Sequence, residues 1–135
     1  MITALFSIIL LRMPLVQEKI TSRYSITGYS ANSVAINEKD YCESLILSAT
    51  TIISPWPVYS VETLELADLV SVLDMNPDVV LLGTGVHQKF PSAQLYAMFG
   101  SRGIGLEVMN NGALCRTFNI LVAEDREVVA AIILE

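Results

Sequence analysis

Residues 78–85 read Asp-Val-Val-Leu-Leu-Gly-Thr-Gly, an apolar run that ends in a pair of glycines. Four apolar residues in succession, with no polar alternation, are typical of a strand buried on both faces. Pro77 precedes this strand, and Gly83 and Gly85 indicate a tight turn at its end. A strand that enters a helix through such a turn presents backbone N–H groups to a ligand or a partner. We therefore expect the fold to be organised around residues 79–82.

Helical and strand patterns alternate on both sides of this strand. Apolar residues at helical spacing predict three helices, and two apolar segments predict strands. The first predicted helix covers residues 63–75, with Ser60 as its N-cap, and the other two follow Pro91 and Asn110 or Asn111. The predicted strands cover residues 105–109 and 128–134. This alternation favours a sheet that is largely parallel, with helices on its faces. Because the turn before the last strand is short, we expect that strand to run antiparallel to its neighbours.

The N-terminal third of the domain predicts β-structure. Residues 24–29 alternate at period two, and residues 34–36 read as the returning strand of a hairpin. The β-branched and apolar residues of 43–53 predict one or two further strands. Trp56 lies between two prolines and is expected to plug the core. The predicted fold is thus a single α/β domain over residues 24–135, with three layers, a central mixed sheet and an N-terminal β-hairpin or meander.

The first residues form an apolar leader or arm, to which we assign residues 1–23. Residues 1–11 are almost entirely apolar, and Arg12 follows this run, whereas a signal peptide carries its positive charge before the run. The run is also shorter than the ~20 residues that span a bilayer. Three interpretations remain: an extension translated from upstream of a start at Met13, an arm that packs on the domain or a partner, or a weak membrane-surface anchor.

Composition excludes several classes of protein. The chain has 135 residues, of which 53% are hydrophobic and 16% charged, so it is long enough and apolar enough to bury a core. Its formal charge is −6, without a basic run, which argues against nucleic-acid binding. Cys42 and Cys115 fit no metal-binding spacing, and we expect both to be reduced thiols packed as small hydrophobic residues. We expect a cytoplasmic protein, with membrane association left open and no integral membrane span.

The motifs of familiar enzymes are missing from the sequence. Gly83 and Gly85 begin a dinucleotide-binding fingerprint, but Gln88 occupies the position of its third glycine. His87 is the only histidine, and the residues around it offer no metal-binding partners, so we expect a loop imidazole in solvent. Cys115 lies on a predicted amphipathic helix that would bury it. The sequence therefore predicts no catalytic residues, no metal, no cofactor and no enzymatic activity.

One crevice remains as a candidate binding site. Ligands of open α/β sheets bind at the carboxyl ends of strands, where the ends of the two strands 79–82 and 105–109 could meet. The candidate residues are Gly83, Thr84, Gly85, Asn111 and Arg116. The glycines and Arg116 also have structural interpretations. The glycines suit a tight turn that needs positive φ, and Arg116 suits a helix-surface charge, which we favour over an anion contact.

Four segments together resemble a known family. They are residues 77–85, 105–109, 113–121 and 126–131, in this order and spacing. They resemble a small single-domain family that includes mitochondrial NADH dehydrogenase (complex I) assembly factor 3 and many bacterial members of undefined function. The resemblance covers about residues 26–134 and is loose in the N-terminal third. It implies a three-layer α/β fold around a mixed sheet, a link to the assembly of a respiratory membrane complex for the mitochondrial relatives, and no established catalytic activity.

Two functional hypotheses follow. The first is a non-catalytic interaction or assembly factor whose protein partner belongs to a respiratory or other membrane complex. It predicts an exposed apolar or aromatic patch involving Phe90, Tyr96 or the N-terminal arm. The alternative is a small-ligand (anion) binding protein, or an unrecognised enzyme, that uses the crevice at the Gly83–Gly85 turn. It predicts a concave pocket with convergent polar groups. We favour the first, because the sequence assembles no catalytic constellation.

Overall fold

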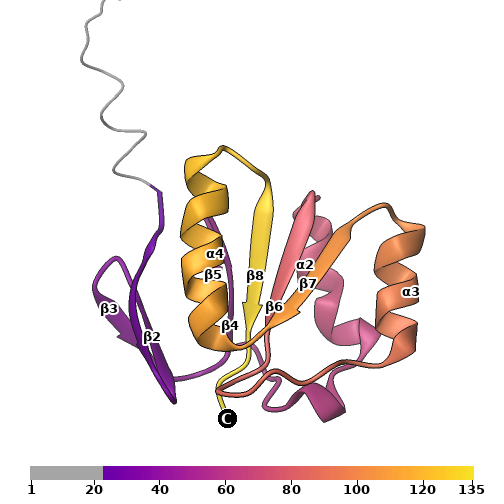
Figure 1. The fold of residues 1–135 in the computed structure, drawn as a ribbon, viewed down its shortest axis with the longest axis horizontal. Helices are drawn as coiled ribbons and strands as arrows, with labels where there is room; N and C mark the ends of the chain where they lie inside the picture. The colour runs from indigo at the N-terminus through magenta and orange to yellow at the C-terminus, as the bar shows by residue number, and fades with distance from the viewer. Residues whose placement is uncertain (1–22) are drawn as a thin grey trace, which may run out of the picture.

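A mixed five-stranded sheet forms the middle layer of the protein, whose residues 23–135 are described by a computed structural model (Figure 1). The strand order is β5-β4-β8-β6-β7. These strands are β4 (Leu45–Ser48), β5 (Ile52–Ile53), β6 (Val79–Gly83), β7 (Gly105–Met109) and β8 (Val128–Ile132). β6 pairs in parallel with β7 and β8, whereas β4 is antiparallel to both β8 and β5. The predicted apolar arm lies outside the described residues, apart from Arg23.

β6, like its neighbour β8, is fully enclosed within this sheet. It has a strand on each side, and all five of its residues are buried. Its side chains alternate between two separate cores. Val79 and Leu81 belong to one core, and Val80 and Leu82 belong to the other. The predicted two-sided burial of residues 79–82 is therefore confirmed, and it places a hydrophobic layer on each face of the sheet.

The first of these layers consists of α4 (Asn111–Ala123) and a small meander. The meander is an antiparallel sheet of β1 (Ile26–Ser30), β2 (Ser33–Ile36) and β3 (Lys39–Tyr41). α4 buries Leu114 and Phe118 against the central sheet. The Asn119 side chain ties β1 to this helix, because its amide accepts from the Ile26 N–H at 2.9 Å and donates to the Ile26 carbonyl at 2.8 Å. The predicted N-terminal meander thus extends the α4 layer.

The second layer covers the opposite face with short helices. They are η1 (Val61–Thr63), η2 (Leu66–Leu69), α2 (Val70–Asp74) and α3 (Ala93–Ser101). α3 contributes the buried Leu95 and Phe99, as its apolar spacing predicted. Trp56 is also buried in this layer, and its indole N–H donates to the Asp68 carbonyl at 2.9 Å. Trp56 is therefore the expected core plug, and the three-layer α/β prediction is confirmed.

The predicted helix over residues 63–75 is wrong in its continuity. Two 3₁₀ turns and the five-residue α2 replace it, and Ser60 makes no side-chain capping hydrogen bond. Glu65 and Asp68 instead form a capping box, in which each side chain accepts from the backbone N–H of the other residue. Because this box restarts the helix at Leu66, a single apolar stripe cannot continue through it. Leu66 and Val70, two apolar residues within the range 63–75, are consequently exposed.

The predicted direction of the last strand is only partly right. β8 is antiparallel to β4 but parallel to its other neighbour, β6. The short turn before β8 does not decide this direction, because α4 itself carries the chain back along the sheet. A strand–helix–strand crossover from β7 past β6 delivers β8 in parallel.

Truncation of the β6 core should therefore cost far more than truncation of an exposed apolar residue. Leu81→Ala should lower the free energy of unfolding by about 2–5 kcal/mol, because Leu81 is fully buried. Ile120→Ala on the exposed side of α4 should change it by about 0.5 kcal/mol or less. Urea denaturation followed by circular dichroism measures both values. Equal losses for the two variants would contradict the central position of β6.

Candidate functional site

The carboxyl ends of β6 and β7 form a topological switch point. The chain leaves β6 for α3, in the layer that contains Phe99, and leaves β7 for α4, in the opposite layer. Adjacent parallel strands whose connections diverge in this way open a crevice at their carboxyl ends. The Gly83–Gly85 turn and the start of α4 meet at this edge of the sheet, which we call the carboxyl edge. In Figure 1 it lies toward the bottom, where the arrow of β8 points.

The side chain of Asn111 lies at this crevice and bonds to both segments around it. Its Oδ1 accepts from the Gly85 N–H at 3.2 Å, and its Nδ2 donates to the Ile133 carbonyl at 2.9 Å. Its backbone N–H also donates to the Gly85 carbonyl at 2.8 Å. The buried Asn111 therefore joins the segments that follow β6 and β8 to the start of α4. A side chain whose amide donates and accepts internally in this way primarily holds the turn together.

The two glycines of the turn serve different purposes. Gly85 has φ +103°, a conformation that residues with side chains rarely adopt. Gly83 lies within β6, and a Cβ there would overlap Asn111 Oδ1 and come within 3.0 Å of Leu114 Cδ1. The expected requirement for positive φ is thus confirmed at Gly85, whereas Gly83 is needed for close packing against Asn111.

The other two predicted site residues lie in different surroundings. Thr84 is buried, and its hydroxyl donates to the His87 carbonyl at 2.7 Å and accepts from the Lys89 N–H at 3.1 Å. It therefore shapes the loop after β6. Arg116 is exposed on α4 and is not among the residues that line the cavity beside the turn. The structure thus brings four of the five predicted residues together and leaves Arg116 apart, and a binding role for the group stays a prediction.

A shallow cavity of about 320 Å³ lies beside the turn, and the β1–β2 hairpin forms its other wall. Its lining combines residues 29–31 of that hairpin with residues 85–86 and 110–112. Sequence reasoning missed the contribution of Tyr29. A Cβ on Gly112 would come within 2.8 Å of the Tyr29 hydroxyl oxygen, so a larger residue there would require the exposed Tyr29 side chain to shift. A glycine in the first turn of a predicted helix was the available signal.

Apolar side chains are exposed along this edge. Tyr29, Val86 and Phe90 have exposed fractions of 52%, 58% and 69%, and we call these three residues the carboxyl-edge surface. Lys89 lies beside them, 3.9 Å from a Glu62 carboxylate oxygen and 3.4 Å from one of Glu135. Tyr96, which was expected with Phe90 in an exposed patch, is also exposed. The carboxyl-edge surface thus exposes apolar side chains near charged groups.

The remaining reactive side chains are the thiols of Cys42 and Cys115 and the imidazole of His87. Burial raises the pKa of the Cys115 thiol to about 11, although the positive charge of Arg116 partly opposes this rise. The expectation of a packed thiol holds for Cys115 but is wrong for Cys42, which is exposed where the chain leaves β3. His87 is exposed, as predicted. Within residues 23–135, no group of three or more His, Cys, Asp or Glu side chains could hold a metal ion.

The family model described as "Protein of unknown function (DUF498/DUF598)" matches residues 26–133, so the chain belongs to this family. The chain is 30% identical over 122 residues to the "13 kDa major membrane protein" of Francisella tularensis subsp. holarctica (strain LVS), which covers 90% of the chain and 99% of that protein. It is also similar to a Xanthomonas campestris protein solved by NMR. The TM-score is 0.80 and the identity 41%, over 90% of this chain and 92% of the other. The mixed α/β fold is thus shared with a solved structure.

A second curated relative is the "NADH dehydrogenase [ubiquinone] 1 alpha subcomplex assembly factor 3" of Danio rerio. The two sequences are 38% identical over 74 residues, which cover 55% of this chain and 41% of that protein. The chain therefore matches less than half of that relative's length. None of the helices within residues 23–135 has the length and apolar character that crossing a bilayer requires.

Adding one methyl group at Gly83 should disrupt the switch point. Gly83→Ala should lower the free energy of unfolding by about 1–3 kcal/mol, because the new Cβ must displace the Asn111 side chain or Leu114. Gly100→Ala is the matched control, since nothing lies within 4 Å of its Cβ and α3 should gain about 0.5–1 kcal/mol. Chemical denaturation compares the two variants. A neutral Gly83→Ala would show that Asn111 does not pack as described.

The two thiols should differ sharply in reactivity. At about pH 8, iodoacetamide should modify the exposed Cys42 and leave Cys115 unmodified, because a thiol with a pKa of about 11 is almost wholly protonated there. Intact-mass spectrometry should show one adduct on the folded protein and two after denaturation. Two adducts on the folded protein would contradict the burial of Cys115.

Proposed function

We propose that this member of the DUF498/DUF598 family is a non-catalytic factor that binds a protein partner during the assembly of a membrane complex. The names of two relatives support this proposal, since one is called an assembly factor and the other a major membrane protein. The partner is a subunit of a respiratory or other membrane complex. The expected cytoplasmic location, with contact to such a complex at the membrane, forms part of the same proposal.

The observation that carries the proposal is the carboxyl-edge surface. Isolated exposed apolar residues are common on soluble domains, but Tyr29 and Val86 line one cavity, and Phe90 follows four residues after Val86. The turn beneath them is fixed by Asn111 and Thr84. A rigid support lowers the entropic cost of binding, because little ordering remains to be done when a partner arrives. Aromatic side chains also contribute strongly to protein interfaces.

The alternative function, a small-ligand site or an unrecognised enzyme at the Gly83–Gly85 turn, has weaker support. The cavity there is large enough for a small molecule, but the side-chain amide of Asn111 in its lining is engaged within the chain. Arg116, the cation expected to contact an anion, lies elsewhere on α4. Thr84 is buried, is bonded to its own loop and does not line the cavity. Binding of a protein through the carboxyl-edge surface therefore accounts for more of the features seen at this edge.

Partner capture should depend on Phe90. Immobilised protein should retain a membrane-complex subunit from detergent-solubilised membranes, and Phe90→Ser should weaken this binding about tenfold or more. Ile120→Ser is the matched control, because Ile120 is similarly exposed on α4, outside the carboxyl-edge surface, and its replacement should leave binding unchanged. Subunits are identified by mass spectrometry, and affinities are measured with the purified subunit.

Two outcomes would contradict the proposal. Retention of no membrane-complex component by the wild-type chain would remove the assembly role. Equal affinities of the Phe90→Ser and Ile120→Ser variants would show that the partner binds away from the carboxyl-edge surface.

A further inference from the structure

A larger cavity lies at the opposite edge of the central sheet. Its volume is about 400 Å³, within the range of small-molecule sites. Its walls come from segments far apart in the sequence: Arg23, the β4–β5 turn, the residues before β6, and the start of β8. We call this edge, where β6 and β8 begin, the amino edge. The proposed partner surface lies at the other ends of the same strands, so the two sites are independent.

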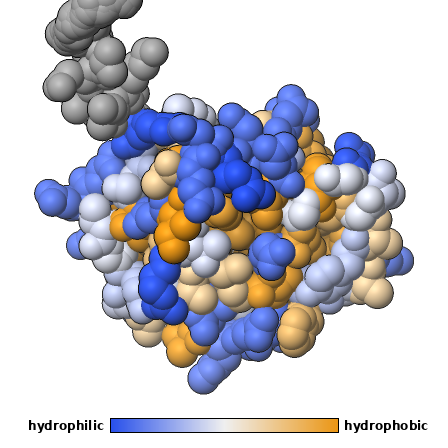
Figure 2. Space-filling model, turned by 45° about the horizontal axis from the view of Figure 1, so that its top comes forward, coloured by the Kyte–Doolittle hydropathy of each residue, from blue (hydrophilic) through white to orange (hydrophobic). Residues whose placement is uncertain are grey.

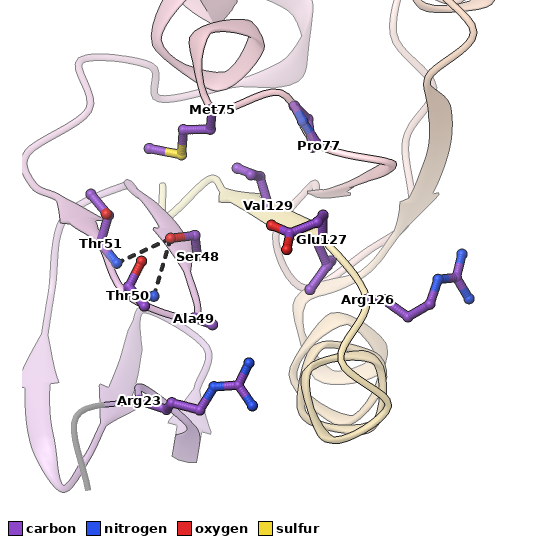
Figure 3. A pocket seen from close by; sticks show the side chains of 11 residues that line it. Arg23, Ser48, Ala49, Thr50, Thr51, Met75, Pro77, Arg126, Glu127 and Val129 are labelled. Carbon is purple, nitrogen blue, oxygen red and sulfur yellow. Dashed lines mark hydrogen bonds between the residues drawn. The ribbon is translucent and has the colours of Figure 1, made fainter. Parts of the chain in front are cut away.

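Glu127 provides an unused negative charge in this cavity. Its backbone carbonyl accepts from the Asp78 N–H at 2.8 Å and fixes the residue at the start of β8. Its carboxylate points into the cavity, toward the β4–β5 turn (Figure 3), and forms none of the ion pairs found among residues 23–135. Glu127 is exposed to solvent at the mouth of the cavity, and a carboxylate there without a cationic partner can receive an ammonium group.

Arg23 provides the opposite charge. One guanidinium nitrogen lies 3.1 Å from Asp125 Oδ1, and the side chains of this pair are 41% and 81% exposed. Ion pairs that are this exposed contribute little to stability, so Arg23 can exchange this partner for a ligand carboxylate. Arg126 also lines the cavity, but its side chain points away from the centre in Figure 3. The cavity thus presents Glu127 and Arg23, which are not paired with each other.

The remaining walls combine hydroxyl groups with an apolar floor. Ser48 Oγ accepts from the N–H groups of Thr50 and Thr51 at 3.3 and 3.0 Å, which fixes the β4–β5 turn. The hydroxyls of Thr50 and Thr51 form none of the side-chain hydrogen bonds found within residues 23–135, so both can contact a ligand. Met75 and Pro77 supply apolar surface. Figure 2, which turns the amino edge toward the viewer, shows hydrophobic surface bordered by hydrophilic residues there.

We propose that the amino-edge cavity binds a small zwitterion, such as an amino acid with an apolar carbon chain. The ligand ammonium lies at Glu127, its carboxylate binds Arg23 and the threonine hydroxyls, and its carbon chain covers Met75 and Pro77. A simple anion would be repelled by the Glu127 carboxylate, and a simple cation would be repelled by the Arg23 guanidinium. Either ligand would therefore face one unfavourable charge in the cavity. A molecule with both charges satisfies both groups.

Four related aliphatic probes test this assignment by thermal unfolding of the full chain. Norleucine and its isomer ε-aminohexanoate carry both charges at different separations, hexanoate lacks the amine, and pentylamine lacks the carboxylate. At least one zwitterion should raise Tm by about 3–5 °C at about ten times its Kd. Hexanoate and pentylamine should raise it much less at the same concentration. Equal shifts from the four probes, or none from either zwitterion, would overturn the proposal.

Variants of the charged groups localise the effect. Glu127→Gln and Arg23→Gln should each remove the zwitterion-dependent shift, because each deletes one of the two charges that the ligand needs. Arg102→Gln is the control, since Arg102 is exposed beyond α3 and does not line the cavity, and it should keep the full shift. Circular dichroism verifies that each variant is folded. A shift that survives in Glu127→Gln would place the ligand elsewhere and overturn the assignment.

Discussion

The enclosure of β6 is the constraint on which the rest of the structure depends. Its five residues are buried on both faces, and strands pair with it on both edges. Two hydrophobic layers are consequently required, and the chain meets this demand by sending α3 to one face and α4 with the meander to the other. Because these two connections diverge to opposite faces of the sheet, they create the switch point at the end of β6. The position of the candidate surface thus follows from the burial of a single strand.

The contacts at the end of β6 hold the surface beside it in a fixed position. Gly83 leaves room for the Asn111 side chain, which in turn holds Gly85 and the segment after β8. These polar groups already form hydrogen bonds within the turn. The edge is therefore better suited to binding a protein partner than to catalysis. The apolar residues Val86 and Phe90 stand on this support and face solvent. A role in binding a partner during assembly therefore agrees with both the geometry and the names of the relatives.

Sequence patterns revealed the features that depend on local burial. The apolar run 79–82, the stripe of α4 and the plug at Trp56 all follow from neighbouring residues. Features decided by distant contacts were missed. The parallel pairing of β8 follows from the path of α4 across the sheet, and the amino-edge cavity unites Arg23 with Glu127, which no spacing rule connects. Burial of Asn111 was likewise invisible, because only the folded chain brings the Ile133 carbonyl to it.

Amide hydrogen–deuterium exchange tests the central position of β6 most directly. The N–H groups of residues 79–83 lie in the middle of two parallel ladders, so they should exchange only when the whole domain unfolds. Their free energy of exchange should equal that of global unfolding, while the meander β1–β3 opens at lower cost. Exchange of residues 79–83 that is as fast as that of the meander would contradict an architecture organised around β6.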